Sequence, residues 1–434
     1  MTIPEIYELF LSHRALSTDT RLNVAGSLFF ALRGETFNGN EFAREAISKG
    51  AAYAVVDEGE FAGDQRFIKV EDTLVTLQEL ARFHRQQIKA GIIAITGSNG
   101  KTTTKELIRE ILAKKYKVCA TEGNLNNHIG VPLSLLRMPE DMDFGIIEMG
   151  ANHIGEIDHL CHIAQPGFGI ITNIGRAHLE GFGSLEGVKQ AKGELYNYLS
   201  GNKGKIFINA GNDMLMQMAG GFKGDMIKYG NSPDSLCSAS VKEVHPTVSA
   251  GIRWSDQTGT EYTCSSGLVG SYNLENILAA ACVGRYFDVN SEDIIKAIEE
   301  YDPGMMRSQL LETDENLIVV DTYNANPSSM QAAILDFAAD PHPYKILVLG
   351  EMKELGDEEM KEHERLIGYL ADKPFDKILL VGTVFSKLTV PDNFVRFDSV
   401  SECEKWLEEN RVKNAKILLK GSRLVKLEEL IKFF

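Results

Sequence analysis

The chain has 434 residues, which at roughly 100–200 residues per domain suggests two to four domains, with three the simplest division. Hydrophobic residues make up 44% and charged residues 24%, a composition typical of folded globular proteins. The 45 Lys and Arg against 61 Asp and Glu give a net charge of −16, which argues against general nucleic-acid binding and requires local positive groups for any anionic ligand.

No apolar run approaches the roughly 20 residues of a membrane-spanning helix, and residues 1–11 lack the basic segment of a secretory signal. The six cysteines form no C-x-x-C pair, so neither a zinc site nor a disulfide framework is expected. We therefore expect a cytoplasmic protein with small-molecule partners and without a membrane or nucleic-acid partner. We also expect a monomer.

Residues 1–88 predict a small N-terminal α/β domain. Strands are expected at 29–32 and 53–56, and a helix at 40–49. A further helix at 74–87 leads into the next domain.

Residues 89–303 predict a central domain of the P-loop ATPase type with a mostly parallel sheet. Residues 92–96 form a continuous apolar run, as parallel strands do when both faces of the sheet are covered. Further expected elements are strands at 144–149 and 168–174, helices at 101–114, 184–199 and 272–287, and an antiparallel patch within 225–265.

Asp302-Pro303-Gly304 interrupts the pattern and marks the start of a third domain, 304–434. Strands at 317–321, 345–350, 377–382 and 417–420 alternate with helices that start near residues 328, 358 and 401. This alternation predicts a doubly wound, Rossmann-like domain. The expected fold class is therefore α/β in three domains.

A glycine-rich turn joins the strand at 92–96 to the following helix. Successive N–H groups of Gly97, Ser98, Asn99 and Gly100 can face one point there, beside the positive end of the helix. In the same turn Lys101 supplies a charge for β- and γ-phosphates, Thr102 a hydroxyl for Mg²⁺, and Thr103 follows. The strict pattern G-x-x-x-x-G-K-[ST] fails at Ile95, so an ordinary strand-to-helix turn is the alternative.

The turn resembles the nucleotide loop of the ATP-dependent Mur ligase superfamily, and further segments follow in family order. They are N-L-N-N-H at 124–128, E-M-G-A-N-H at 148–153, T-N-I-G-R-A-H at 172–178, A-K-G-E at 191–194, N-L-E-N at 273–276, Y-N-A-N-P at 323–327, L-G-E-M-K-E-L-G at 349–356 and K-G-S-R at 420–423. The resemblance thus runs through nearly the whole chain.

This resemblance implies an ATP-dependent amide ligase that works through an acyl phosphate. The segments at 323–327 and 349–356 are similar to the branch that joins D-alanyl-D-alanine to UDP-N-acetylmuramoyl-tripeptide. Residues 1–88 would then bind the UDP-linked substrate, 89–303 ATP, and 304–434 the dipeptide and part of ATP. Another ligase of the superfamily, diaminopimelate-adding or folylpolyglutamate-forming, is the alternative, and a nucleotide-dependent switch without chemistry is a rival of another class.

The resemblance also implies two Mg²⁺ ions held by Thr102, Glu148, His178 and Lys192. Lys192 would be carbamylated by CO₂, because an unmodified ammonium would repel the metal ions. Lys101, Glu148, His178 and Lys192 form the expected catalytic group. The residue types alone leave other interpretations open: an exposed carboxylate at a strand end, a structural histidine and a solvated lysine.

For ATP, the resemblance places Asn273 near the adenine and Asp321 at the ribose, with Asn324 nearby. The alternative for Asn273 is a helix N-cap. Arg307 would contact the γ-phosphate. Two methionines separate it from Pro303-Gly304, whereas the family often has P-G-R, so its register is open.

Substrate contacts are expected from Asn124, Asn126 and Asn127, whose amides suit a peptide or a phosphate. Arg33 lies in a segment that resembles the part of the family that holds UDP. Arg423 ends a basic turn suited to the carboxylate of the dipeptide. Turn asparagines and a solvated basic turn are the alternatives.

Overall fold

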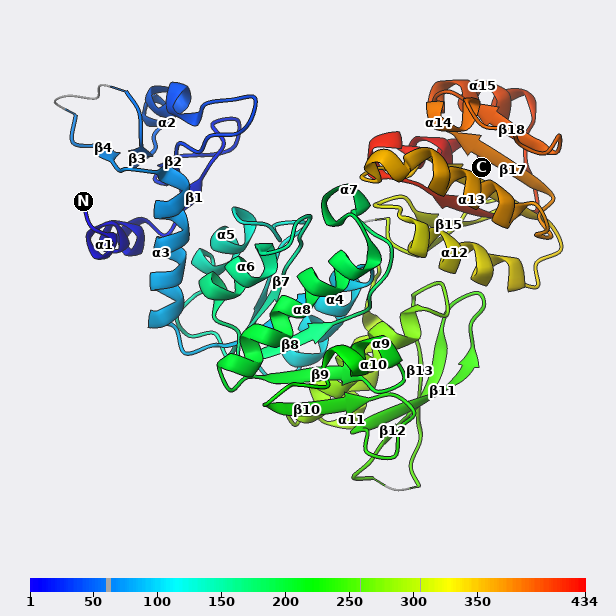
Figure 1. Cartoon of the computed structure of the whole chain (residues 1–434), viewed down its shortest axis with the longest axis horizontal. Helices are drawn as coiled ribbons and strands as arrows, with labels where there is room; N and C mark the ends of the chain where they lie inside the picture. Colours follow the sequence, from blue (N-terminus) through cyan, green and yellow to red (C-terminus); the bar gives the residue numbers. More distant parts are fainter. Residues whose placement is uncertain (60–63, 258, 305) are drawn as a thin grey trace.

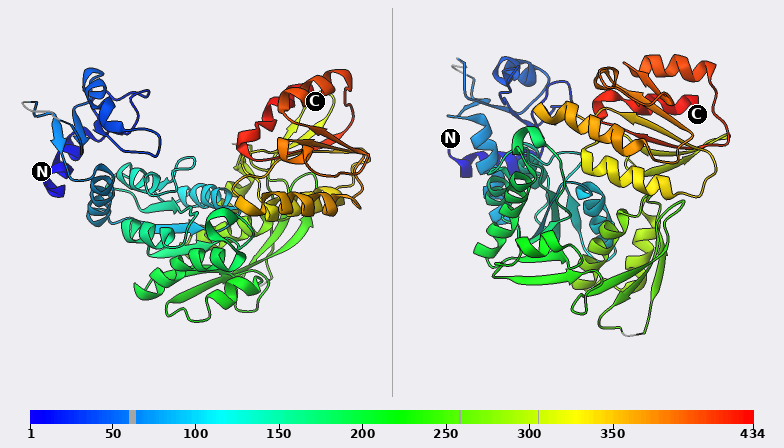
Figure 2. Two further views of the ribbon diagram at one scale, coloured as in Figure 1. Left: turned by 45° about the horizontal axis from the view of Figure 1, so that its top comes forward. Right: turned by 45° about the vertical axis from the view of Figure 1, so that its right-hand side comes forward.

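The computed structural model describes residues 1–59, 64–257, 259–304 and 306–434. Three β-sheets organise it, of four, nine and six strands. The N-terminal and C-terminal domains stand on opposite sides of the top of the central domain (Figures 1 and 2). The expected three-domain α/β fold is confirmed.

The N-terminal domain is a parallel four-stranded sheet in the order β1-β2-β3-β4. Its elements are α1 (Ile3–His13), β1 (Leu16–Ser17), β2 (Leu28–Phe30), η1 (Gly39–Phe42), α2 (Ala43–Ser48), β3 (Tyr53–Val56), β4 (Phe67–Lys69) and α3 (Thr73–Gln87). The helix expected at 40–49 is thus split into a 3₁₀ turn and a short α-helix.

Helix α3 joins the N-terminal domain to the central one (Figure 1). Its apolar face belongs to one buried cluster that includes Phe10 of α1 and Leu135 of α5 (Gly130–Leu136). The buried His84 of α3 contacts the Tyr7 hydroxyl through Nδ1 and the Met138 carbonyl through Nε2, both at 2.9 Å. The two domains therefore share a continuous core.

The central sheet has the order β13-β12-β11-β10-β9-β8-β5-β7-β6. Strands β5–β10 pair in parallel. The expected antiparallel patch is formed by β11–β13 at one end of the sheet, whereas β10, which lies in the same stretch of sequence, pairs in parallel with β9. The elements are β5 (Gly91–Thr96), α4 (Lys101–Ala113), β6 (Val118–Ala120), α5 (Gly130–Leu136), β7 (Phe144–Glu148), α6 (Glu156–Ala164), β8 (Phe168–Ile171), α7 (Leu179–Phe182), α8 (Leu185–Gly201), β9 (Lys205–Asn209), α9 (Asp213–Met218), β10 (Asp225–Tyr229), β11 (Cys237–Glu243), β12 (Ser249–Trp254), β13 (Tyr262–Ser265), α10 (Asn273–Tyr286) and α11 (Ser291–Glu300).

Residues of β5 alternate between two buried clusters. Ile92 and Ala94 pack into the cluster of α3, α5, α6 and α8, whereas Ile93 and Ile95 pack into that of α4, α10 and α11. Both faces of the sheet are covered, which explains the uninterrupted apolar run that predicted this strand.

The C-terminal domain is a six-stranded sheet in the order β14-β15-β19-β16-β17-β18, parallel except for β14. Its strands also feed two buried clusters, one under α12 and α13 and one under α15 and η4, so the expected double winding is present. The elements are β14 (Gln309–Glu312), β15 (Leu317–Asp321), α12 (Pro327–Ala339), β16 (Lys345–Gly350), η2 (Gly356–Glu358), α13 (Glu359–Leu370), β17 (Lys377–Val381), α14 (Thr383–Ser386), β18 (Phe394–Phe397), α15 (Val400–Glu409), β19 (Lys416–Lys420), η3 (Arg423–Val425) and η4 (Leu427–Phe433).

A buried ion cluster lies where the central and C-terminal domains meet. Asp340, at the end of α12, pairs with Lys416 of β19 and lies 3.1 Å from Nδ1 of His245 in the β11–β12 loop. Burial by itself would raise the pKa of Asp340, but the hydrogen bonds from Lys416 and the His342 amide outweigh it and hold that pKa below its usual range.

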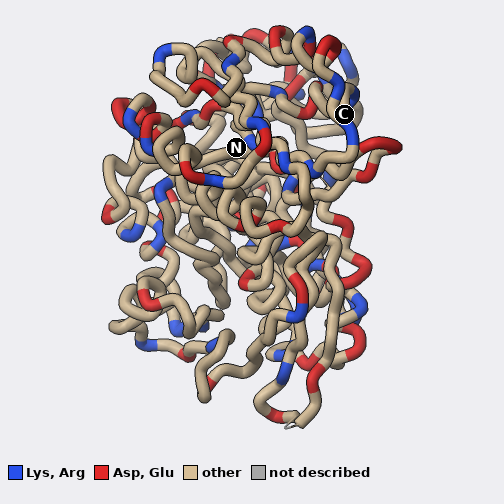
Figure 3. The backbone as a smooth tube through the Cα atoms, turned by 90° about the vertical axis from the view of Figure 1, so that its right-hand side faces the viewer, with Lys and Arg blue, Asp and Glu red and all other residues tan. Residues whose placement is uncertain are grey.

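Acidic and basic residues are interspersed along the backbone rather than gathered by sign (Figure 3). Within the described residues, no helix is both long enough and apolar enough to span a bilayer.

Candidate active site

A cleft of about 1220 Å³ lies between the central domain, the C-terminal domain and helix α3. The carboxyl ends of β5 and β7 open into it from one sheet, and those of β15 and β19 from the other. Open α/β sheets bind ligands at this edge of the strands. The predicted site residues line the cleft, with three exceptions: Gly97, Lys192 and Arg33.

The glycine-rich turn at 97–100 joins β5 to α4, and its residues 98–100 line the cleft. Gly97 has φ +141° and Gly100 has φ +79°, conformations that favour glycine. A Cβ at Gly97 would lie 2.0 Å from Thr172 Oγ1, and one at Gly100 would lie 2.4 Å from Asn276 Oδ1. Both glycines are therefore required by backbone conformation and by close packing.

Lys101 begins α4 and folds back over the turn. Its Nζ donates hydrogen bonds to the carbonyls of Gly97, at 2.7 Å, and Ser98, at 3.3 Å. Burial lowers the pKa of Lys101, because the charged form loses water without gaining a full counter-charge. An anion that entered the turn would supply that missing charge.

Thr102, Glu148 and Asn126 converge beside the turn. Thr102 Oγ1 donates to Glu148 Oε2 at 2.9 Å, and Asn126 Nδ2 donates to Glu148 Oε1 at 2.8 Å. Glu148 is only 2% exposed, so the carboxylate is buried at the strand end, contrary to the exposed alternative. A hydroxyl and a carboxylate are the oxygen ligands that Mg²⁺ prefers.

Lys192 lies in the interior beside the cleft, on α8. Its side chain is 1% exposed, and its Nζ approaches the Ala151 carbonyl at 3.4 Å and the Phe182 ring centroid at 5.2 Å. Burial, and then the positive charge of Lys101, lowers the pKa of Lys192 to about 7. The lysine is thus a buried amine rather than a solvated one, and much of it is neutral near pH 7.

His178 meets the C-terminal domain across the cleft. Its Nδ1 lies 2.7 Å from a carboxylate oxygen of Glu354, which precedes η2. This close approach of His178 is the main cause that lowers the pKa of Glu354. Both residues have positive φ, +51° and +63°, so each is held in an uncommon backbone conformation at this contact.

Asn273 is the first residue of α10, not its N-cap, which is Tyr272. Its Nδ2 donates to the Val269 carbonyl, and its Oδ1 accepts from Asn276 Nδ2, both at 2.8 Å. The N-cap interpretation is therefore wrong for Asn273. Its side chain is instead a buried part of the cleft wall.

Arg307 and Arg423 share one aromatic ring on the C-terminal side. The guanidinium carbon of Arg307 lies 3.5 Å from the centroid of Tyr323, and that of Arg423 lies 5.4 Å from it. The Nε of Arg307 is buried without a hydrogen-bond partner. Two cations and an unpaired donor therefore line this wall of the cleft, as an anionic ligand requires.

Asp321 and Asn324 lie at the end of β15. Asp321 accepts a hydrogen bond from Lys420 Nζ at 2.5 Å, so Lys420 is a buried partner of this carboxylate and not part of a solvated basic turn. Asn324 Oδ1 accepts from the Ala325 amide at 2.8 Å, which leaves its amide nitrogen toward the cleft.

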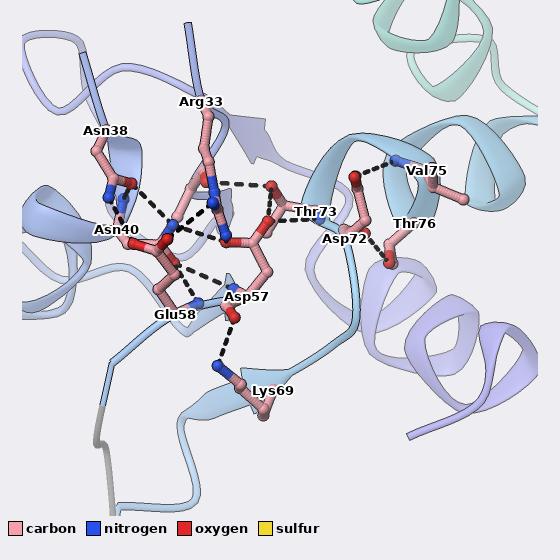
Figure 4. A network of polar contacts seen from close by, with 11 residues as sticks. Arg33, Asn38, Asn40, Asp57, Glu58, Lys69, Asp72, Thr73, Val75 and Thr76 are labelled. Atoms are coloured by element: carbon pink, nitrogen blue, oxygen red, sulfur yellow. Dashed lines mark hydrogen bonds and ion pairs between the residues drawn. The ribbon is translucent and has the colours of Figure 1, made fainter.

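The remaining predicted substrate residues divide into two groups. Asn124 and Asn127 line the cleft with Asn126, and Asn127 Oδ1 also accepts from the Gly130 amide at 2.9 Å, as a turn asparagine does. Arg33 lies in the N-terminal domain, paired with Asp57 at 2.8 Å and Glu58 at 2.7 Å (Figure 4). The structure does not bring Arg33 to the cleft.

Sequence reasoning gave no role to several residues that line the cleft. Gln78 of α3 donates to the His128 carbonyl at 3.0 Å, and Leu424 faces the cleft while 77% exposed. Glu354 stood in a recognised segment without an assigned function. Gln78 and Glu354 carry no local signal, because each contacts a partner distant in sequence.

Family models match three stretches of the chain: "Mur ligase family, catalytic domain" at residues 14–85, "Mur ligase middle domain" at 95–284, and "Mur ligase, glutamate ligase domain" at 306–423. The UDP-N-acetylmuramoyl-tripeptide–D-alanyl-D-alanine ligase of Bacillus subtilis is 35% identical over 98% of this chain and 94% of its own.

Two solved structures share the fold over nearly their full length. MurF from Acinetobacter baumannii superposes with a TM-score of 0.87 at 29% identity, covering 98% of this chain and 97% of that one. MurF ligase from Thermotoga maritima, in complex with ADP, gives 0.85 at 28% identity with the same coverage.

Proposed function

Because the chain belongs to the Mur ligase family, we propose that its cleft is the active site of an ATP-dependent ligase that joins D-alanyl-D-alanine to UDP-N-acetylmuramoyl-tripeptide. The products are the UDP-linked pentapeptide precursor of peptidoglycan, ADP and phosphate. We further propose that the enzyme is a monomer. We also propose that it is cytoplasmic, because ATP and nucleotide-linked precursors are available in the cytoplasm.

Each domain takes one part of the reaction in this proposal. Residues 1–88 bind the UDP end of the acceptor, 89–303 bind ATP, and 304–434 bind the dipeptide and part of ATP. The cleft supports this division because both the central and the C-terminal sheet open into it at their carboxyl edges. Arg33 would bind the UDP end away from the cleft, either while it is paired with Asp57 or after that ion pair opens.

The reaction has two chemical steps. The terminal carboxylate of the tripeptide attacks the γ-phosphorus of ATP, and ADP leaves, which gives an acyl phosphate. The amine of D-alanyl-D-alanine then attacks the acyl carbon, loses a proton, and phosphate departs as the amide forms. Amide formation from two free ions is unfavourable in water, and coupling to ATP makes it favourable.

The turn at 97–103 carries the phosphates in this proposal. Backbone N–H groups and Lys101 hold them, since burial leaves the Lys101 ammonium short of a counter-charge. Arg307, with its unpaired buried Nε, approaches the phosphates from the C-terminal side. Asn273 contacts the adenine, and Asp321 and Asn324 the ribose. Charge that develops on the transferring group is thus met by groups already in place.

The oxygen donors present, Thr102 Oγ1 and Glu148, are suited to one Mg²⁺ ion, and a second would need the carbamate of Lys192. Thr102 Oγ1 and Glu148 would hold one ion, and His178 and a carbamylated Lys192 the other. Among the described residues, no three His, Cys, Asp or Glu side chains cluster closely enough to hold a metal alone. This suits Mg²⁺, which keeps waters and substrate phosphates in its shell. When bound, the ions neutralise charge on the phosphates.

Lys192 supports carbamylation through its environment. A primary amine reacts with CO₂ in its neutral form, and burial with the nearby Lys101 charge brings the Lys192 pKa to about 7. The product is an anion, which would remove a repulsive cation from the metal site. Asn124, Asn126, Asn127 and Arg423 complete the proposal as contacts to the peptide substrates.

The convergence of Lys101, Thr102 and Glu148 on one turn, in a cleft that also holds the arginine pair of the C-terminal domain, carries this proposal. The test is ATP turnover with UDP-linked tripeptide and candidate amine donors added one at a time. We expect ADP release to require D-alanyl-D-alanine. Stimulation by diaminopimelate or glutamate instead would identify another ligase of the superfamily, and ATP binding without turnover would identify a switch.

A further inference from the structure

One hydrogen bond links the phosphate-binding turn directly to the C-terminal domain. Asn326 Nδ2 donates to Asn99 Oδ1 at 2.8 Å. The two residues are 227 positions apart in the chain. Asn99 lies within the turn, and Asn326 is the N-cap of α12, the helix that follows Asp321, Tyr323 and Asn324.

Both asparagines are fixed by other bonds before they meet. The backbone of Asn99 donates to Asn173 Oδ1 at 3.0 Å and accepts from Thr172 Oγ1 at 2.6 Å. Asn326 closes a capping box with Ser329: its Oδ1 accepts from the Ser329 amide at 2.9 Å, and its own amide donates to Ser329 Oγ at 3.1 Å. The bond therefore joins two rigid supports, not two mobile side chains.

A second contact brings the same helix end against the same wall. Ser328 Oγ accepts from the Arg176 amide at 2.7 Å. A Cβ on Gly175 would lie 2.6 Å from Ser328 Oγ, so the approach depends on the absence of a side chain there. The N-terminal end of α12 thus sits directly on the segment that follows β8, beside the turn.

We propose that Asn99 and Asn326 are positioning residues that register the C-terminal domain on the phosphate-binding turn and so couple nucleotide binding to dipeptide binding. The inference rests on the proposed function. The turn would bind the phosphates. The segment leading into α12 would bind the ribose, and its Tyr323 packs against the arginine pair. A shift of α12 relative to Asn99 therefore separates the two halves of one ligand site.

The test is a double-mutant cycle of Asn99→Ala and Asn326→Ser. Alanine removes only the side-chain bond of Asn99, and serine keeps an N-cap acceptor for Ser329 but cannot reach Asn99. Asn212→Ser, at the N-cap of α9, is the matched control for the cap change, since Asn212 makes the same kind of cap without bonding the other domain. Gly175→Ala is an independent route to the same displacement.

Three quantities are measured: the Kd of a non-hydrolysable ATP analogue, the KM of D-alanyl-D-alanine, and the radius of gyration by small-angle X-ray scattering. We expect each single variant to raise Kd and KM about two- to tenfold, the loss of one neutral hydrogen bond. The double variant should match either single one, Gly175→Ala should resemble them, and Asn212→Ser should match the wild type.

The proposal is overturned if the effects of the two variants multiply, if both constants stay unchanged, or if only kcat and the unfolding temperature fall. Failure of the proposed function gives a different result. The wild type would then bind the analogue without consuming dipeptide, and the cycle on Kd and on the radius of gyration would still decide whether the contact registers the two domains.

Discussion

Replacing Lys101 with methionine separates the role of its charge from its role in packing. In the structure, Lys101 Nζ binds two carbonyls of its own turn, and burial lowers its pKa. The folded protein therefore binds the Lys101 proton less tightly than the unfolded chain does. The contribution of Lys101 to the free energy of unfolding accordingly rises with pH. Without ligand, we expect Lys101→Met to unfold at the same temperature as the wild type or a higher one.

With nucleotide, the same substitution should be costly. Loss of a hydrogen bond to a charged group removes about 1.5–3 kcal/mol of binding, which is a Kd roughly 10- to 150-fold weaker. At a ligand concentration of 100 times the wild-type Kd, the stabilisation by ADP should fall from about 2.7 kcal/mol to between about 1.4 and 0.3 kcal/mol. Loss of a donor to the transferring phosphoryl group should lower kcat about 10²–10³-fold.

Thermal unfolding with and without ADP, together with ADP release in the presence of both peptide substrates, measures these effects. Lys117→Met, which removes an exposed lysine paired with Asp141, is the control and should behave as the wild type. A folded Lys101→Met enzyme with turnover within tenfold of the wild type would refute the phosphate role of this residue.

Three further predictions concern other parts of the site and the domain junction. Lys192→Met and Lys192→Arg should each lower kcat at least about a hundredfold, and ¹³C-bicarbonate should give a carbamate signal that both variants lack; an active arginine variant would contradict this. Tyr323→Leu should raise the KM of the dipeptide or ATP about two- to thirtyfold through loss of the cation–π contacts of Arg307 and Arg423. Tyr323→Phe keeps the ring and should leave both KM values unchanged. Equal effects of the two variants would contradict a role for the ring. Asp340→Asn should destabilise the protein by about 3–5 kcal/mol at neutral pH, because Lys416 is left buried and unpaired. Since the pKa of Asp340 is lowered on folding, its stabilisation is present above the unfolded value and lost as pH falls, so denaturant unfolding of the variant should depend less on pH below about 4.

The fold was predictable where the residue pattern alone determined the structure. Strands β5, β15 and β16 are apolar without interruption because helices cover both faces, so a short window identifies them. Six strands were missed: β1, β4, β6, β9, β14 and β18. β6 has only three residues, all half-buried, and its pairing with β7 is not encoded in its own sequence.

The site divides in the same way. The residues at 97–102 are contiguous in sequence, so their glycines and lysine predict a phosphate site from a short window of sequence. The contact of His178 with Glu354, the burial of Lys192 and the bond between Asn99 and Asn326 each join segments that meet only after folding. The roles of Lys192 and His178 came from resemblance, because a lysine on an amphipathic helix and a histidine in a loop have no chemistry that a window of sequence can show.

The shared core beneath α3 affects how this protein can be recombined with its relatives. Exchange of the N-terminal domain at residue 88 would mismatch α3 and His84 with their central-domain partners, Leu135 of α5 and the Met138 carbonyl, so a chimera made there would need that interface transplanted too. The C-terminal domain has one cluster of its own, whereas its other cluster also includes Leu179 and Val269 of the central domain. Hydrogen bonds at the start of α12 add to this apolar junction. A graft at residue 304 would therefore need a C-terminal domain that fits Leu179 and Val269, and it would exchange the C-terminal part of the proposed ATP site together with the dipeptide site.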